Sequence, residues 1–224
     1  MRIATWNVER LKHIRSLPEI VAVCDSLQSD ILVLTESDER IMPGFRYCFH
    51  TPTPPPLKIR GYDMPVMYSR TEHRVSIYTN YPCIRQHTTF DCHTAICLEL
   101  ETERGNLLVY GTIMGVAGNR DPSFISDLIC QTEDFCKFSA EHHLCICGDF
   151  NCSFADNYYY TETGRRQLNA SFLENDIALL TAKCPSCIDH IAVSRSFVGD
   201  NSVRICEWNN DKRLSDHKGV FVEI

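Results

Sequence analysis

The chain has 224 residues, of which 44% are hydrophobic and 23% are charged, and its formal net charge is -7 at pH 7. This length can bury a sizeable core, and we expect one domain that spans residues 1–224. No apolar run is long enough for a transmembrane segment, and the acidic balance argues against a protein dedicated to tight nucleic-acid binding.

The amino terminus and the cysteines indicate the cellular compartment. MRIATWNVER carries charged residues where the apolar segment of a signal peptide would lie, so we expect no such peptide. Most of the 13 cysteines are then expected to be buried thiols of a cytoplasmic protein. Cys184 and Cys187 form an isolated CPSC, which lacks the further ligands of a zinc site and the context of a redox motif. We expect this pair to be structural.

Short apolar runs rich in β-forming residues alternate with helical patterns along the chain. We expect strands at residues 2–6, 31–34, 144–147 and 191–193. A helix over residues 16–27 precedes the second strand, and the side chains expected to face the sheet are Leu17, Ile20, Val21, Val23 and Cys24. This order of elements predicts an α/β fold.

Three further segments complete the pattern. Residues 50–56, HTPTPPP, are expected to form a rigid surface loop, because proline cannot donate to a sheet or continue a helix. Asp121 and Pro122 begin a second helix, whose apolar face is expected to hold Phe124, Leu128, Ile129 and Phe135. A third helix is expected to begin at about Thr163, with Leu168, Phe172 and Leu173 packed inward.

Polar side chains follow the strands along the whole chain. They are Asn7, Glu9, Glu36, Asp149, Asn151, Asp189, Asp216 and His217. Polar groups that end such runs sit where a sheet opens to solvent, so residues far apart in sequence can meet in one cleft. Taken singly, each has a plain explanation as a turn former, a cap or a structural hydrogen-bonded pair. Taken together, they suggest a metal-dependent hydrolase.

The residue types are compatible with this chemistry. Carboxylate and amide oxygens are hard ligands suited to Mg²⁺ or Mn²⁺, and no dense cluster of His and Cys favours zinc. An acid and an imidazole, Asp189 and His217, can pair to orient a proton carrier or to donate to a phosphate oxygen. Asp149 and Asn151 stand two residues apart and can position a water molecule.

Five segments carry a resemblance to a known superfamily. TWN, the Glu after the second strand, GDFN, IDHI and SDHKGV occur in this order over nearly the entire chain. In this respect the chain resembles the endonuclease/exonuclease/phosphatase superfamily, which includes deoxyribonuclease-like enzymes, abasic-site endonucleases, inositol polyphosphate phosphatases and bacterial sphingomyelinases. The resemblance implies a four-layer α/β sandwich, in which two mixed β-sheets pack face to face with helices outside.

The resemblance also implies roles for individual residues. It implies Mg²⁺ or Mn²⁺ near Asn7, Glu9, Glu36 and Asp216, with Glu36 the most dependable ligand. The residues that resemble the catalytic group are Asp149, Asn151, Asp189 and His217. Asp149 would activate water or assist the leaving group, Asn151 would orient phosphate and nucleophile, and Asp189 would orient His217. The implied reaction is an in-line attack of water on a phosphorus ester.

One position departs from the superfamily pattern. The strand LLVYGTIMG aligns with a segment that usually offers a His or Tyr toward the phosphate, and the matching residue here is Thr112. A threonine hydroxyl can donate a hydrogen bond but cannot act as an imidazole acid at neutral pH. Either the phosphate contact is weaker, or His93, His87 or Tyr110 supplies it.

Candidate substrate contacts follow GDFN, in YYYTETGRRQLN. Tyr158 could stack on a base, and Arg165 and Arg166 could reach phosphates, with a solvated helix start as the alternative. Three further basic pairs are Lys58 with Arg60, Arg70 with Arg74, and Lys212 with Arg213. The simpler interpretation of each pair is that it lies on the solvated surface. We predict a nuclease acting on DNA or RNA. The alternatives are a hydrolase of a small-molecule or lipid phosphoester, and a non-catalytic binding protein on the same scaffold.

Overall fold

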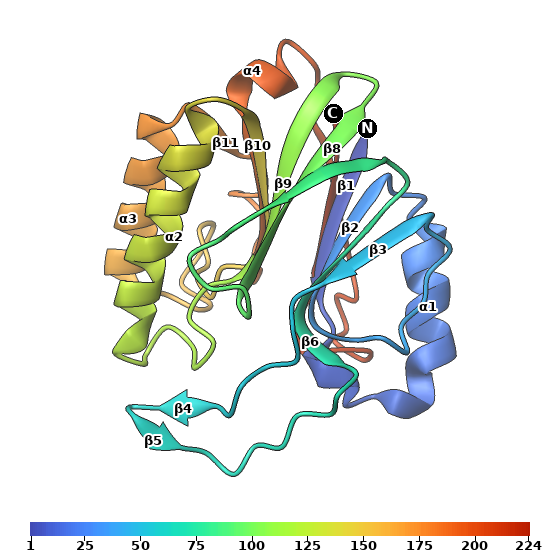
Figure 1. Ribbon diagram of the computed structural model, residues 1–224, viewed down its shortest axis with the longest axis vertical. Helices are drawn as coiled ribbons and strands as arrows, with labels where there is room; N and C mark the ends of the chain where they lie inside the picture. The colour runs from blue at the N-terminus through green and yellow to red at the C-terminus, as the bar shows by residue number, and fades with distance from the viewer.

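Two six-stranded sheets pack face to face in the computed structural model, which describes residues 1–224 (Figure 1). The first sheet contains, in spatial order, β13 (Arg204–Trp208), β14 (Gly219–Glu223), β1 (Arg2–Asn7), β2 (Ile31–Asp38), β6 (Glu72–Thr79) and β3 (Tyr47–His50). The second contains β11 (Ile177–Leu179), β12 (Asp189–Ser194), β10 (His143–Asp149), β9 (Gly105–Ile113), β8 (Ala95–Thr102) and β7 (Cys83–His87). Both sheets are mixed, because β1 pairs parallel with β2 and β10 pairs parallel with β9, whereas the other neighbours are antiparallel.

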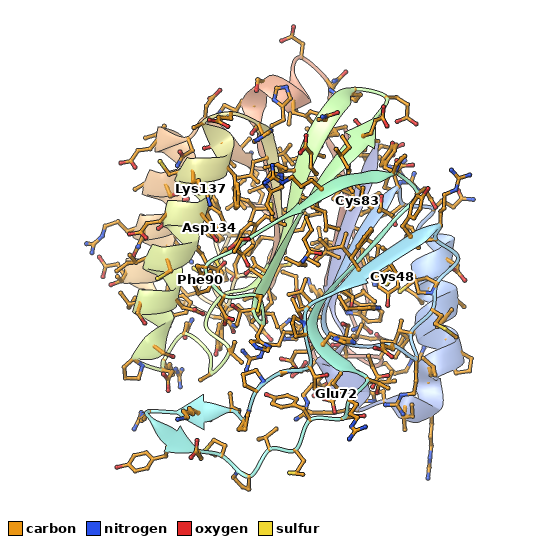
Figure 2. The ribbon with its side chains drawn as sticks, in the orientation of Figure 1. Cys48, Glu72, Cys83, Phe90, Asp134 and Lys137 are labelled. Carbon is orange, nitrogen blue, oxygen red and sulfur yellow. The ribbon has the colours of Figure 1, made fainter.

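Alternation along the strands builds the core between the sheets. Ile31 and Val33 of β2 face the second sheet, whereas Leu32 and Leu34 face the opposite side. On β10, Cys145 and Cys147 lie in the core between the sheets. Side chains fill the space between the two sheets and beneath the helices (Figure 2). A strand that is buried on both faces reads as a continuous apolar run, which is the pattern seen in the sequence.

Helices cover the outer face of each sheet. α1 (Leu17–Ser26) lies against the first sheet, and α2 (Ser123–Ser139) and α3 (Glu162–Glu174) lie side by side against the second (Figure 1). The short helices are η1 (Glu9–Leu11), η2 (Ile14–Ser16) and α4 (Arg195–Val198). The predicted four-layer α/β sandwich is confirmed. None of the helices has the length and apolar character needed to traverse a lipid bilayer.

The helix starts follow from local capping. The Thr161 hydroxyl accepts a hydrogen bond from Gly164 N at 3.3 Å, so α3 begins at Glu162, one residue before the expected start. The Asp121 carboxylate accepts from Ser123 N at 2.9 Å at the start of α2. The prediction that Leu173 and Ile129 point inward is wrong, because their side chains are 80% and 43% exposed. Each directly follows a buried residue of its helix, and successive helical side chains point about 100° apart.

The segment from Thr51 to Thr71, which we call the arm, connects β3 with β6. It contains β4 (Lys58–Ile59) and β5 (Tyr62–Asp63), which pair with each other and belong to neither large sheet. Residues 51–57 form neither helix nor strand, in agreement with the expected proline-rich loop. The arm crosses one end of the sandwich (Figure 1). At this end β2 and β10 carry the candidate site.

Candidate active site

The predicted catalytic residues come together at the end of the sandwich that the arm crosses. Asn7 and Glu36 lie at the ends of β1 and β2 in the first sheet. Asp149 and Asp189 lie opposite each other on β10 and β12 in the second sheet. The Asn7 amide connects the two sheets, because its Nδ2 lies 3.2 Å from Asp149 Oδ2 and 3.4 Å from Glu36 Oε1.

Asp189 and His217 form a buried pair. His217 Nδ1 donates to Asp189 Oδ2 at 2.6 Å, and the carboxylate is only 1% exposed. Burial lowers the pKa of His217, but the charge and hydrogen bond of Asp189 outweigh this effect and raise that pKa to about 10. The main-chain carbonyl of His217 accepts from Trp6 Nε1 at 3.1 Å, which fixes the loop before β14. The imidazole is therefore held by one ring nitrogen, with Nε2 left for other partners.

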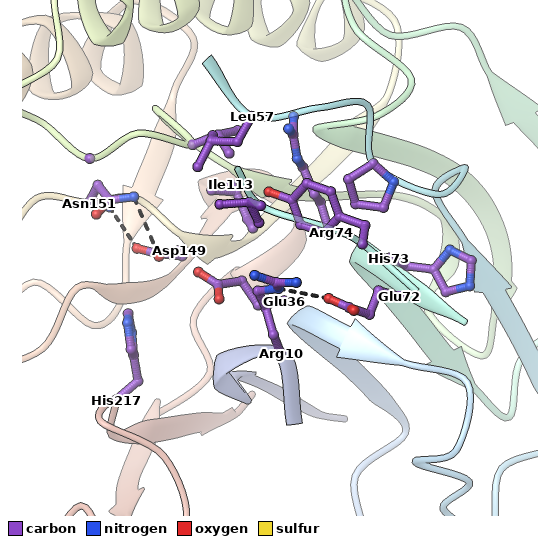
Figure 3. Close-up of a pocket in the computed structure, with 15 residues that line it drawn as sticks. Arg10, Glu36, Leu57, Glu72, His73, Arg74, Ile113, Asp149, Asn151 and His217 are labelled. Atoms are coloured by element: carbon purple, nitrogen blue, oxygen red, sulfur yellow. Dashed lines mark hydrogen bonds and ion pairs between the residues drawn. The ribbon is translucent and has the colours of Figure 1, made fainter. Parts of the chain in front are cut away.

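Asp149 and Asn151 form the second half of the site. Asp149 Oδ1 accepts from Asn151 N at 2.8 Å (Figure 3). The Asn151 side-chain amide also donates to Met114 O at 3.0 Å. Asn151 has a φ of 48°, a left-handed conformation that Asn tolerates better than most residues. Burial raises the pKa of the Asp149 carboxyl to about 7. This carboxyl is fixed in place and can exchange a proton near neutral pH.

Glu36 reaches the cleft through an unusual backbone conformation. Val33 and Thr35 share one face of β2, so regular alternation would direct Glu36 to the opposite face, toward α1. Its φ of 46° breaks this alternation, and its side chain lines the cleft. Burial raises the pKa of Glu36, and Asn7 is its only hydrogen-bonding side chain. A carboxylate that forms no ion pair, beside an amide and further carboxylates, fits a hard divalent cation.

Glu9 and Asp216 have different surroundings from Glu36. Glu9 accepts from Lys12 Nζ at 2.6 Å and from Asp216 N at 3.2 Å, so it supports the loop that carries Asp216. The hydrogen bonds from Lys12 and Asp216 outweigh partial burial and lower the pKa of Glu9. The Asp216 side chain is 64% exposed and has Oδ1 3.7 Å from His217 Nε2. Asp216 is therefore available to a ligand, whereas Glu9 acts as a support.

Two cavities flank the Asp149 and His217 side chains. The arm-side cavity, of about 220 Å³, is lined by Glu36, Asp149, Asn151 and His217 together with Arg10, Leu57, Val66, Tyr68, Glu72 and Arg74 (Figure 3). The loop-side cavity, of about 460 Å³, is lined by Asn151, Asp189, Asp216 and His217 together with Tyr158, Tyr159, Ser186, Lys212 and Lys218. One wall of the first cavity is apolar, and both cavities carry cationic side chains.

Comparison with known proteins identifies the family. The Endonuclease/Exonuclease/phosphatase family profile matches residues 4–217. The chain belongs to this family. As an Endonuclease/Exonuclease/phosphatase family protein it is a metal-dependent phosphoric ester hydrolase, so the alternative of a non-catalytic binding protein is set aside. No curated protein matches the chain in sequence.

Solved structures of low sequence identity share the fold of this family protein. The 3' phosphatase NExo from Neisseria, bound to a product DNA hairpin, has a TM-score of 0.71 at 18% identity, covering 100% of this chain and 99% of its own. An AP endonuclease from Archaeoglobus fulgidus has a TM-score of 0.70 at 14% identity, covering 100% and 99%. The AP endonuclease LMAP from Leishmania major has a TM-score of 0.71 at 14% identity, covering 99% and 86%.

Thr112 lies outside both cavities of this family protein. Its hydroxyl is fully buried and donates to Gln131 Oε1 of α2 at 2.7 Å. The suggested replacements are not in the cleft either. Tyr110 is buried and donates to Asp134 of α2 at 2.9 Å, His87 lies 3.3 Å from Glu99 on the outer strand pair β7 and β8, and His93 lines neither cavity. None of these four side chains lines either cavity.

The other three residues expected to contact substrate lie in different places. Tyr158 is half exposed and lines the loop-side cavity, where Lys212 Nζ lies 4.4 Å from its ring centre. Arg165 donates to Ser153 O at 3.0 Å and so supports the loop after β10. Arg166 is exposed on α3 and lines neither cavity. Of these three side chains, only Tyr158 lines one of the two cavities.

The sequence patterns missed several residues that line the arm-side cavity. Arg10 donates to Glu72 Oε2 at 2.7 Å and to Met67 O at 2.9 Å, and it lies over the Tyr68 ring. Arg74 was recognised only as half of a basic pair expected on the surface, but it is 8% exposed. The position of Arg10 depends on its contacts with the arm, and that of Arg74 on the pairing of β6 with β2; no local sequence signal indicates either.

Proposed function

We propose that this protein is a nuclease that hydrolyses phosphodiester bonds of DNA or RNA with Mg²⁺ or Mn²⁺. The observation that supports this function is the distribution of positive charge along the cleft. Arg10 and Arg74 line the arm-side cavity, and Lys212 and Lys218 line the loop-side cavity. A nucleic-acid strand crossing Asp149 would have phosphates on both sides of the reacting bond, and phosphate neutralisation dominates the affinity for such strands.

The local cations answer the objection raised by the net charge of -7. A strand needs positive charge only where it lies, and a bound divalent cation adds to that charge. The Tyr158 ring beside Lys212 offers a stacking surface at the mouth of the loop-side cavity. A short cleft that carries a few cationic side chains suits local cleavage of a strand better than tight, extended binding.

The side chains supply the elements of an in-line hydrolysis. A divalent cation held by Glu36, with Asn7 or Asp216, would polarise a phosphoryl oxygen and stabilise the charge that develops there. Asp149 accepts a proton from the attacking water, because burial brings the pKa of its carboxyl to about 7. Asp189 keeps the His217 imidazole protonated and oriented, so its Nε2 donates to a phosphoryl oxygen.

A small phosphoester is the second candidate substrate. The arm-side cavity of about 220 Å³ has an apolar wall that includes Leu57 and Val66, and it fits one small organic group beside Asp149. A phosphatase or phosphodiesterase acting on a small-molecule or lipid phosphoester would use the same catalytic residues. We favour the nucleic acid because the loop-side cavity extends the cleft beyond one such group.

Hydrolysis assays with a matched histidine control test this proposal. The purified protein, His217→Ala and His142→Ala are incubated with labelled single-stranded DNA, duplex DNA and RNA in Mg²⁺ or Mn²⁺, with chelator controls. His142 lies after α2 and lines a different cavity. We expect cleavage that requires the metal, is lost in His217→Ala and is kept in His142→Ala. Phosphate release from small phosphoesters alone would replace the nuclease proposal with the second candidate.

Two further proposals concern the chain as a whole. All 13 cysteines are free thiols, which suits a reducing compartment, and we place the protein in the cytoplasm. We also treat residues 1–224 as one catalytic domain, because the cleft draws side chains from both sheets and from both halves of the sequence.

A further inference from the structure

Arg74 is a buried, charged side chain of the cleft that forms neither an ion pair nor a hydrogen bond within the protein. It is 8% exposed, and its Nε forms no hydrogen bond. Its neighbour Arg10 is satisfied differently, with an ion pair to Glu72 at 2.7 Å and a hydrogen bond to Met67 O. No ion pair or side-chain hydrogen bond involves the Arg74 guanidinium, so its charge is available to a ligand in the arm-side cavity.

Glu36 and Arg74 both lie between the same two residue pairs of β2 and β6. Thr35 pairs with Val75 and Ser37 pairs with His73, and Glu36 and Arg74 are the residues between these pairs. Both side chains line the arm-side cavity, where Arg74 lies among the residues around Glu36 and Leu57 (Figure 3). A group that meets the cation proposed at Glu36 is therefore within reach of Arg74.

No carboxylate of the protein forms an ion pair with the Arg74 guanidinium. Asp127 is an acid whose pKa the Arg74 charge lowers, but burial has the larger effect and raises that pKa. The Asp127 carboxylate accepts from Gly115 N at 2.8 Å and makes no ion pair with Arg74. An unpaired cation removed from water is costly, and proteins seldom keep one without a counter-charge. The missing counter-charge points to an anionic ligand.

We propose that Arg74 binds phosphate oxygens of the substrate in the arm-side cavity. This inference deepens the proposed function and rests on it for the identity of the substrate. A guanidinium presents a planar set of donors that matches two phosphate oxygens. The Thr112 hydroxyl is turned toward Gln131, so it supplies no contact here. Arg74 takes the place of that contact from a different strand and from the opposite sheet.

Phosphate binding without turnover gives the first test. Inorganic phosphate is titrated calorimetrically, in the presence of chelator, into the unmodified protein, Arg74→Gln and Arg85→Gln. Arg85 is exposed on β7, so the control removes the same charge outside the cleft. We expect binding at least about tenfold weaker in Arg74→Gln and unchanged in Arg85→Gln. Equal binding by Arg74→Gln, or no saturable binding by the unmodified protein, overturns the proposal.

Thermal melting separates a ligand-binding arginine from a structural one. In phosphate-free buffer, Arg74→Gln should melt at the same temperature as the unmodified protein or higher, because an uncompensated buried charge has been removed. Phosphate should then raise the melting temperature of the unmodified protein but not that of Arg74→Gln. A large fall in melting temperature for Arg74→Gln without phosphate shows a structural role and overturns the proposal.

NMR of the unmodified protein tests the same contact without relying on the folding of a variant. Arginine Nε–H resonances are followed by NMR during phosphate addition and are assigned with Arg74→Lys. The resonance of Arg74 should shift saturably, and its failure to shift while the protein remains folded refutes the assignment. For a substrate that the enzyme hydrolyses, Arg74→Gln should raise KM about tenfold or more. Phosphate binding that persists when no nucleic acid is cleaved rejects the nuclease function alone.

Discussion

Replacing Asp189 with Asn removes the charge that holds His217 and preserves the shape of the side chain. Asp189 is buried and accepts from His217 Nδ1 at 2.6 Å. Its charge and hydrogen bond are the largest effects that raise the pKa of His217, whereas burial alone lowers that pKa. In Asp189→Asn the imidazole should therefore be neutral at pH 7, and an amide that points its nitrogen at Nδ1 would reverse the hydrogen bond.

The expected size follows from the pKa of His217, which is about 10 in the folded protein against an ordinary value of 6.5. At about 1.4 kcal/mol for each pKa unit, this difference corresponds to a stabilisation of at most about 5 kcal/mol. Because the folded pKa is raised, the stabilisation is fully present below pH 6.5 and is lost as the pH rises toward 10. Loss of an oriented proton donor should also reduce kcat by about 10² to 10⁴.

Urea unfolding in the presence of chelator, at pH 6 and near pH 10, tests the reasoning on stability. Asp189→Asn should be much less stable than the unmodified protein at pH 6, and the difference should shrink near pH 10. NMR titration of the His217 ring should show its pKa below the ordinary value in the variant. A stability difference that is the same at both pH values, together with unchanged hydrolysis, would show that the pair is not an ionic one.

Three further predictions concern the metal, acid stability and the helix faces. Glu36→Gln should raise the metal concentration needed for half-maximal hydrolysis about tenfold or more. Stability in chelator should not fall, because burial raises the pKa of Glu36 and no ion pair is lost. Burial lowers the pKa of His190 to about 4, so between pH 6.5 and 4 the unfolded chain binds a proton that the folded protein does not. This costs about 3 kcal/mol as the pH falls, and His190→Gln should lose that dependence in urea unfolding. Leu168→Ala should cost about 2 to 5 kcal/mol of unfolding free energy, whereas Leu173→Ala should change it by less than about 0.5 kcal/mol; similar values for both would contradict the observed face of α3.

The sequence allowed the sandwich and most of the cleft to be predicted, because both depend on short-range patterns. Apolar strands end at Asn7 and Asp149, and an antiparallel strand begins at Asp189, so these residues meet at one edge of the sandwich. The order of the five motifs supplied the two-sheet arrangement, which strand patterns alone do not specify. Glu36 was identified from its motif, although its position in the cleft depends on a left-handed backbone conformation.

The sequence did not predict where Thr112 and Arg74 lie. Their positions depend on which face of a strand each residue occupies and on contacts with distant segments. On β9, Val109 and Ile113 face the first sheet, so Thr112 belongs to the alternate set with Tyr110 and faces α2. A displacement of one residue in the assigned phase moves a side chain to the other face. Alternation from Val75 would likewise place Arg74 away from the cleft. Only the folded β2 and β6 pair brings it beside Glu36.

The Asn7 amide has a mechanical consequence, since it lies between Glu36 of the first sheet and Asp149 of the second. The side-chain oxygens on the two sides of the cleft therefore belong to different sheets. The apolar core between the sheets determines how the sheets are placed relative to each other. A slight rotation of one layer about the far end of the sandwich would displace the atoms at the cleft most. Small shifts in the packing between the two sheets are therefore expected to lower the rate of hydrolysis before any loss of folded structure can be detected.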